Sequence, residues 1–257
     1  RFYTYLSTLH YVMEACAKNN THLIVLDRPN PHVNYVDGPV LENNFVSFVG
    51  MHKVPVVYGM TIGEYSLMIN GERWLKDDLV CSLEVVEIMD YTRTCVIEYR
   101  NPPSPNLKSF AAILLYPSLC FFEGTKISVG RGTNYPFEMY GAPFFNTNYQ
   151  FTPASNFGAN NPKYNQQICY GFNLKNYFTN NNLRVNKINL DFLINAYNLT
   201  PSYFKSDFFN PFFNNLAGND KLKHQIINNV SEEDIRKSWV SDIQDFMLIR
   251  SKYLLYN

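Results

Sequence analysis

The sequence lacks the features that mark several common classes of protein. No apolar run approaches the ~20 residues that cross a membrane as a helix, and Lys+Arg 22 balance Asp+Glu 22. Because the basic residues are scattered along the chain, we expect neither a transmembrane segment nor nucleic acid as a partner. The 5 cysteines have irregular spacings, with no C-x-x-C pair and no cluster with histidine. This pattern argues against a disulfide framework and against a metal site.

Motifs of nucleophilic and nucleotide chemistry are also missing. No G-x-S-x-G elbow occurs, and the histidines are solitary in the sequence, so no catalytic triad is predicted: His10, His22, His32, His52 and His224. The GRGT sequence at 130–133 lacks the Lys-Ser/Thr ending of a phosphate-binding loop. A phosphate or nucleotide site at GRGT is therefore the weakest of the options considered, and we expect no cofactor.

The composition is that of a folded protein. Of the 257 residues, 46% are hydrophobic and 16% aromatic, whereas disordered chains are poor in aromatic residues. A chain of this length holds one large domain or two smaller ones.

The first third of the chain has the pattern of an α/β protein. Apolar residues recur at helical spacing over 2–16, and HLIVL (22–26) predicts a buried strand after that helix. The segment 27–39 is rich in Pro, Gly and Asx residues, which predicts an ordered loop without regular structure. Ligands of open α/β sheets bind at such carboxyl ends of strands.

Further elements follow in alternation. VPVVYG (54–59) is strand-like, and Thr61 with Glu64 forms a capping box that predicts a helix through about Trp74. Alternation over 79–88 predicts another strand, and 109–122 predicts a helix that is broken at Pro117.

From about Phe144 the composition shifts to Asn, Tyr, Phe and Pro. Strands are predicted at 168–174 and 183–190, a helix at 190–199, and a C-terminal helix from a capping box at Ser231 and Asp234. We therefore predict an α/β domain at 1–145 and a smaller α+β domain at 146–257.

Acids within loop motifs are the first candidates for chemistry, because glycosidases typically use a pair of carboxyl groups: Asp27, Asp37, Glu42, Glu64 and Glu123. Asp27 is either a ligand contact or half of a structural pair with Arg28. Glu64 is either an acid or a capping residue. Glu123 lies between Phe122 and Gly124, where apolar neighbours would raise its pKa toward that of a general acid.

The segment 116–143 carries the most polar candidates. Its glycines surround Ser128, Arg131 and Thr133, which would let backbone amides, hydroxyls and a guanidinium approach a ligand. The alternative is a plain glycine turn. Aromatic side chains near polar loops, Tyr58 among them, are candidates to stack on sugar rings.

Several motifs in order resemble one family. RFYTYLST, VLDRPNP, YGMTIGE, YPSLCFFEGTKISVGRGTNYPFEMYGAP and DFMLIRSKYLLY are similar to the bacterial exo-β-N-acetylmuramidases of the NamZ type, formerly a family of unknown function. The resemblance implies a Rossmann-like catalytic domain, then a smaller auxiliary domain. It also implies an exported enzyme that removes terminal N-acetylmuramic acid from the non-reducing end of peptidoglycan fragments, in cell-wall turnover and recycling.

The resemblance also assigns site residues. It places in the pocket Asp27, Arg28, Asn30, Glu64, Glu123, Ser128, Arg131 and Thr133. Glu64 and Glu123 are the expected acids, and Arg131 suits the lactyl carboxylate of muramic acid. The family's principal acid is the glutamate of an upstream Glu-His-Gly motif, after which this sequence begins, so we expect the catalytic domain to be N-terminally incomplete here. The alternative is a non-catalytic binder of cell-wall sugars.

Overall fold

The computed structural model describes residues 3–95, 101–178 and 185–257. The chain divides into two compact units, each described by itself below. Unit 1 comprises residues 1–97 together with 236–257, and unit 2 comprises residues 98–235. This division differs from the boundary predicted after residue 145, which stays a prediction.

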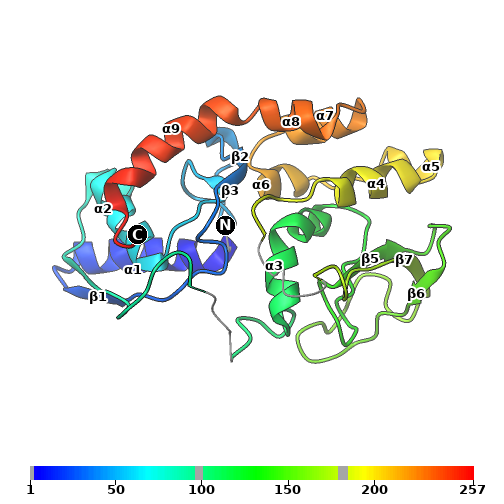
Figure 1. Cartoon of the computed structure of the whole chain (residues 1–257), viewed down its shortest axis with the longest axis horizontal. Helices are drawn as coiled ribbons and strands as arrows, with labels where there is room; N and C mark the ends of the chain where they lie inside the picture. Colours follow the sequence, from blue (N-terminus) through cyan, green and yellow to red (C-terminus); the bar gives the residue numbers. More distant parts are fainter. Residues whose placement is uncertain (1–2, 96–100, 179–184) are drawn as a thin grey trace. The chain divides into compact units, whose positions relative to one another are not determined.

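Unit 1 is a mixed helical and strand unit built around a parallel strand pair. Its elements are α1 (Tyr3–Lys18), β1 (Leu23–Leu26), β2 (Asp37–Val40), η1 (Asn43–Phe45), β3 (Pro55–Val57), α2 (Ile62–Gly71), η2 (Lys76–Asp78), β4 (Leu83–Val86), α9 (Val240–Arg250) and η4 (Ser251–Tyr253). β1 pairs in parallel with β4, from Leu23 opposite Leu83 to Leu26 opposite Val86. α2 packs against both strands, and α9, the last of the described α-helices in sequence, lies beside β2 (Figure 1).

The predicted first helix, first strand and capping box are confirmed. Thr61 Oγ1 accepts from Glu64 N at 3.2 Å, and Glu64 Oε2 accepts from Thr61 N at 2.9 Å. These reciprocal bonds satisfy amide groups that the helix itself leaves free. α2 ends at Gly71, three residues before the predicted end at Trp74.

The prediction that the first strand is buried is wrong for most of it. Val25 is buried, whereas Ile24 is 54% and Leu26 is 72% exposed. The two faces of a strand alternate. The face of β1 that carries Ile24 and Leu26 is therefore open among the described residues.

The prediction of no regular structure over 27–39 is also partly wrong. Residues from Asp37 onward form β2, which pairs antiparallel with β3. Gly38 and Pro39 suggest a turn, but a two-stranded ladder with an irregular register tolerates both at its bulge.

Two of the histidines predicted to be solitary lie together in the core. His10 Nδ1 is 2.9 Å from His52 Nε2, and His52 Nδ1 is 3.0 Å from the Tyr65 hydroxyl. Trp74 stacks on His52 at a centroid distance of 4.8 Å. Burial, with His10 beside it, lowers the pKa of His52 to about 3, so this imidazole is neutral at pH 7.

Unit 2 combines helices with a three-stranded antiparallel sheet. Its elements are α3 (Phe110–Leu119), η3 (Cys120–Gly124), β5 (Met139–Ala142), β6 (Tyr149–Phe151), β7 (Cys169–Asn173), α4 (Asp191–Leu199), α5 (Ser202–Lys205), α6 (Phe213–Ala217), α7 (Lys221–Ile227) and α8 (Glu232–Lys237), whose last two residues fall in unit 1. The strand order is β5-β7-β6 (Figure 1). Large fully buried rings fill this unit: Phe121, Phe122, Phe137, Phe208 and Phe213. Burying such a side chain stabilises the fold by about 1.5–3 kcal/mol.

Three predictions about helices and strands in this part of the chain need correction. α3 is not broken at Pro117 but continues to Leu119 before the 3-10 turn η3. The predicted strand at 183–190 is wrong where it is described, because 185–190 form no strand, and 183–184 lie outside the described residues. The C-terminal helix is two helices, α8 and α9, separated before Val240.

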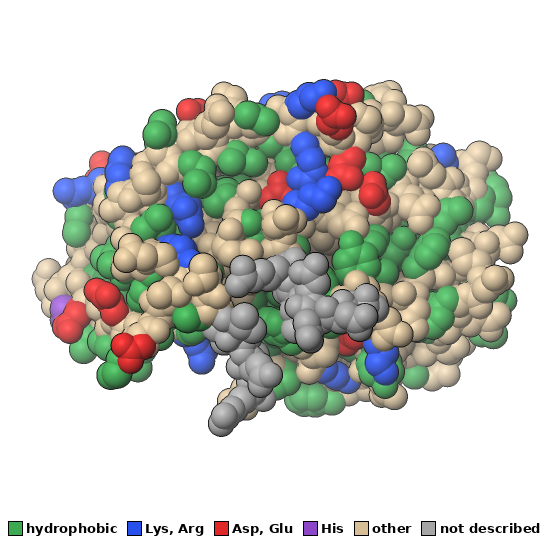
Figure 2. Space-filling view, viewed as in Figure 1, with side chains coloured by type: hydrophobic (Ala, Val, Ile, Leu, Met, Phe, Trp, Pro, Cys, Tyr) green, Lys and Arg blue, Asp and Glu red, His purple; other side chains and the backbone are tan. Residues whose placement is uncertain are grey.

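Surface charge shows no single-sign stripe on the face in Figure 2, where acidic and basic side chains are scattered among uncharged ones. Over the described ranges, no helix is long and apolar enough to cross a membrane. Nor do three or more His, Cys, Asp or Glu side chains there gather in a way that could hold a metal ion.

Candidate functional site

The predicted site residues divide between the two units. Asp27, Arg28, Asn30, Tyr58 and Glu64 belong to unit 1. Glu123, Ser128, Arg131 and Thr133 belong to unit 2. Each cluster is therefore described separately.

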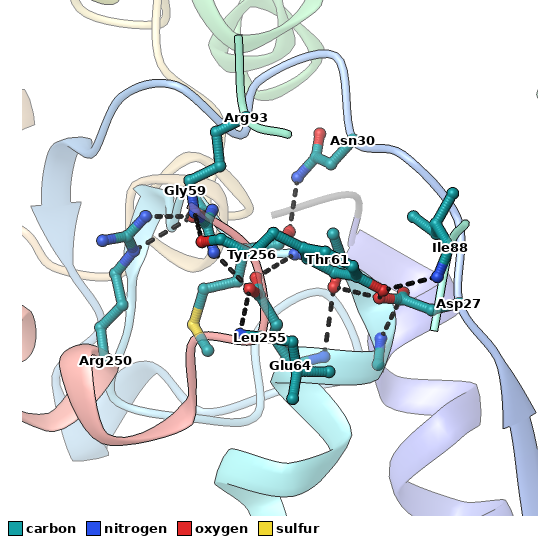
Figure 3. A network of polar contacts seen from close by, with 12 residues as sticks. Asp27, Asn30, Gly59, Thr61, Glu64, Ile88, Arg93, Arg250, Leu255 and Tyr256 are labelled. Carbon is teal, nitrogen blue, oxygen red and sulfur yellow. Dashed lines mark hydrogen bonds and ion pairs between the residues drawn. The ribbon is translucent and has the colours of Figure 1, made fainter. Parts of the chain in front are cut away.

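Asp27 follows β1 and anchors a polar network at the carboxyl end of the strand pair (Figure 3). Its Oδ1 accepts from the backbone amides of Arg28 at 2.9 Å and Gly63 at 2.8 Å. Its Oδ2 accepts from the hydroxyls of Thr61 at 2.6 Å and Tyr256 at 2.7 Å. A carboxylate has about four sites that accept hydrogen bonds, and these four bonds fill them. Asp27 therefore joins the end of β1 to the start of α2 and to the C-terminal segment.

The Glu64 carboxylate, like that of Asp27, is bound by groups of the fold. It is 0% exposed, and besides the capping bond its Oε1 accepts from the Leu255 amide at 2.9 Å and pairs with the Arg93 guanidinium. A carboxylate held in this way acts as a structural counter-ion. These contacts favour the capping interpretation, and the expectation that Glu64 is an acid stays a prediction.

Two arginines converge on one carbonyl in the same network. The Gly59 oxygen accepts from Arg93 NH1 at 3.1 Å and from Arg250 Nε at 3.0 Å and NH2 at 2.6 Å (Figure 3). Burial, with Arg93 nearby, lowers the pKa of Arg250 to about 10, and Glu64 opposes that shift. Glu64 thus supplies the negative charge beside these guanidinium groups: it pairs with Arg93 and opposes the pKa shift of Arg250.

The other predicted residues of unit 1 are also used by the fold. Asn30 Nδ2 donates to the Met60 carbonyl at 2.8 Å, and its Oδ1 accepts from the His32 amide at 2.9 Å. Arg28 contacts Asp27 through its backbone amide rather than as an ion pair. Tyr58 is only 6% exposed and packs on Tyr65 at a centroid distance of 4.9 Å, so it presents no platform to a ligand.

Unit 2 holds an open pocket of about 460 Å³. Its lining combines apolar walls with charged and amide side chains: Phe122, Glu123, Ile127, Ser128, Val129, Arg131, Ala159, Asn160, Asn161, Pro162 and Lys163. Three of the predicted residues, Glu123, Ser128 and Arg131, therefore share one cavity. Pockets of this size with a few convergent polar groups are typical of small-ligand sites.

Glu123 and Arg131 form a partly open pair in this pocket. Arg131 NH2 donates to Glu123 Oε2 at 2.8 Å, and the side chains are 40% and 28% exposed. Burial raises the pKa of Glu123, although the nearby cations of Arg131 and Lys163 oppose that shift. The Arg131 Nε has no acceptor within the described part of the chain. The pair therefore keeps unused hydrogen-bonding capacity.

Lys163 is the charged pocket residue that the sequence did not single out. Its ammonium donates to three backbone carbonyls, those of Phe122 at 3.3 Å, Ile127 at 2.9 Å and Thr125. Burial lowers the pKa of Lys163 to about 8, against the favourable charge of Glu123. A carboxyl group with a raised pKa and an amine with a lowered pKa in one cavity are typical of functional sites.

Ser128 and Thr133 hold the glycine-containing turn. Ser128 Oγ accepts from the Gly130 amide at 3.2 Å, and Thr133 Oγ1 donates to the Gly130 carbonyl at 2.6 Å. Gly130 has φ +73°, which favours glycine. The segment is thus both a glycine turn and a pocket wall. Thr133 supports the turn and is not among the residues that line the cavity.

Sequence reasoning missed the partners that come from distant segments. Arg93, Arg250 and Tyr256 complete the unit 1 network, and Asn160, Asn161 and Lys163 complete the unit 2 pocket. A lysine after a proline in an Asn-rich loop carries no local signal of burial.

Comparison with known proteins identifies similar sequences over the whole chain. Models of exo-beta-N-acetylmuramidase NamZ match residues 1–111 as its N-terminal part and 114–256 as its C-terminal part. The chain is 36% identical over 275 residues to peptidoglycan beta-N-acetylmuramidase NamZ of Bacillus subtilis (strain 168). That match covers 100% of this chain and 64% of the relative's length.

Solved structures agree with this match. Two DUF1343 family proteins from Bacteroides fragilis NCTC 9343 superpose with TM-scores of 0.95 and 0.80, at 43% and 25% identity. Each comparison covers 100% of this chain and 72% of the other. The mixed helix and strand fold described above is therefore that of these structures.

Proposed function

Because the chain belongs to the NamZ family of exo-β-N-acetylmuramidases, we propose that it is a glycoside hydrolase acting on peptidoglycan fragments. Its reaction is release of terminal N-acetylmuramic acid from the non-reducing end, in cell-wall turnover and recycling. The chain spans 64% of the length of the Bacillus subtilis relative. The activity of the whole protein is therefore proposed for this chain. We also propose that the protein is exported to where such fragments occur, periplasmic or extracellular.

The observation that carries the proposal is the Glu123 pocket. Glycoside hydrolysis needs a carboxylic acid that is protonated near neutral pH and faces the scissile bond. Burial raises the pKa of Glu123, and the pocket beside it is open. We assign Glu123 the role of an acid that assists either the leaving group or the water that attacks the sugar.

Arg131 gives the pocket its selectivity for muramic acid in this proposal. The sugar differs from glucosamine by a lactyl carboxylate, and a guanidinium binds carboxylates through a planar fork of donors. Arg131 and Lys163 together give the cavity an excess of positive charge, which favours an anionic group on the ligand.

Unit 1 supplies support in this proposal. The parallel pair β1 and β4 with α2 packed on it is compatible with a Rossmann-like catalytic domain, whose ligands bind at the carboxyl ends of strands. Asp27, Asn30 and Glu64 fix the loops at that end. We propose that these three residues hold the loops of unit 1 in place.

The test is release of N-acetylmuramic acid from muramyl-ended fragments by the native protein at its full length. Glu123→Gln is expected to lower kcat by about a hundredfold or more, the usual scale for a general acid. Asp207→Asn, an exposed acid of the same unit, is the matched control and should have little effect. Release that survives Glu123→Gln would overturn the assignment of Glu123. Binding of the sugar by the wild type without any release would favour the non-catalytic sugar binder instead.

A further inference from the structure

A tight turn in unit 2 lies directly before the pocket wall. Asn156 and Ala159 exchange backbone hydrogen bonds of 3.1 and 3.0 Å, with Phe157 and Gly158 at the tip. Asn106 Nδ2 donates to the Gly158 carbonyl at 2.8 Å. Gly158 has φ +92°, a conformation that other residues rarely adopt. The two bonds between Asn156 and Ala159 and the bond from Asn106 hold the tip in place.

The fixed tip presents an aromatic ring to solvent. Phe157 is 87% exposed, and no ring contact is recorded for it within the described chain. Because hydrogen bonds hold the backbone of the turn, binding need not order that backbone, and the flat face of the exposed ring suits another apolar face.

The same segment continues into the pocket. Ala159, Asn160 and Asn161 line the cavity that also holds Glu123 and Arg131. The side chains of Asn160 and Asn161 are exposed and form no recorded hydrogen bond within the described residues. Each amide offers two donors and one acceptor, which match sugar hydroxyl and acetamido groups.

The end of the segment is held as firmly as its start. Pro162 packs closely on Gly132, because a Cβ added to Gly132 would lie only 2.7 Å from the Pro162 ring. Lys163 donates hydrogen bonds to three backbone carbonyls. A rigid segment that leaves one ring and two amides unused has the composition of a saccharide site, an apolar platform beside hydrogen-bonding groups.

We propose that residues 156–161 form a second saccharide subsite, continuous with the Glu123 pocket, which binds the pyranose ring next to the muramyl unit. Phe157 stacks on the apolar face of that ring, and Asn160 and Asn161 bind its polar edge. The subsite rests on the proposed function, because the pocket must first hold the muramyl end.

Calorimetry on the full chain tests this subsite with two probes, N-acetylmuramic acid and the disaccharide in which a non-hydrolysable thioglycosidic bond links it to N-acetylglucosamine. The wild type should bind the disaccharide more tightly. Phe157→Ala should weaken disaccharide binding by about fivefold, the scale of one aromatic contact, and leave the monosaccharide unchanged. The Asn160→Ala, Asn161→Ala double variant should act in the same direction. Tyr203→Ala, an exposed aromatic on α5 that does not line the pocket, is the control.

The outcomes separate the two hypotheses. If Phe157→Ala and the double variant both bind the disaccharide as the wild type does, the subsite is overturned and the pocket stands. If the wild type binds neither probe, the pocket itself is overturned, and the subsite with it. A selective loss of disaccharide affinity in either variant, with an unchanged thermal midpoint, supports the subsite.

Discussion

The pairs Glu64–Arg93 and Glu123–Arg131 contain the same two side-chain types and differ in how fully the fold uses them. Glu64 is 0% exposed, and backbone amides and a guanidinium occupy both of its oxygens. Glu123 is partly exposed, and its arginine partner has a donor that meets no acceptor among the described residues. An acid–arginine pair is therefore a structural element where its bonds are saturated, and a candidate site where they are not.

Neutralising the two acids should give the largest difference between the pairs. Glu64→Gln leaves Arg93 without its buried counter-charge and should lower the free energy of unfolding by about 3 kcal/mol. Glu123→Gln should change it by about 1 kcal/mol or less, because that pair is partly solvated. Urea unfolding followed by circular dichroism measures both. Glu72→Gln, at the opposite end of α2 and paired with exposed Lys252, is the control. Equal losses in Glu64→Gln and Glu123→Gln would contradict the distinction.

Lowering the pH should reduce the contribution of His52 to the stability of unit 1 and increase the contribution of Glu123 to the stability of unit 2. The pKa of His52 in unit 1 is lowered from 6.5 to about 3, so the unfolded chain takes up this proton first. Stability from His52 is present above pH 6.5 and is lost as the pH falls toward 3, by about 2 kcal/mol between pH 6.5 and 5. The raised pKa of Glu123 in unit 2 gives the opposite pH dependence, because its contribution to stability is lost as the pH rises above 4.5.

Fluorescence can follow unit 1 by itself, because the chain's 2 tryptophans, Trp74 and Trp239, both belong to it. Its unfolding midpoint in urea should fall between pH 6.5 and 5, and the fall should be smaller in His52→Gln. A fluorescence midpoint independent of pH in this range would contradict the prediction.

Removing one hydroxyl should have a smaller effect than removing the charge of Glu64. Tyr256→Phe takes away the bond to Asp27 and leaves the Ile88 amide, 3.0 Å from that hydroxyl, without an acceptor. A loss of about 1–2 kcal/mol is expected in the same urea assay. Tyr253→Phe removes a single bond, to Glu72, and should cost less. A larger loss in Tyr253→Phe would show that the Asp27 network is not the tighter of the two.

Local patterns in the sequence predicted the local structure well. The capping box of Thr61 and Glu64 sets the start of α2, and the apolar spacing of the first helix matches α1. Both depend on residues within a few positions of each other, where helix geometry decides the contacts.

The sequence could not show which acids are saturated. Glu64 meets Arg93 across 29 residues and Asp27 meets Tyr256 across 229, and no local pattern encodes these pairings. The same holds for Lys163, whose carbonyl partners lie 36 to 41 residues earlier. The motif in 116–143 indicated polar groups near one another, but the cavity depends on the distant wall at 159–163.

The discontinuity of unit 1 has a consequence for folding during synthesis. Unit 2 is one continuous stretch, complete once residue 235 has left the ribosome, whereas unit 1 waits for residues 236–257. Until then Asp27 lacks the Tyr256 hydroxyl, and Gly59 lacks the Arg250 donors. Synthesis therefore provides all the residues of unit 2 before unit 1 has its own last helix.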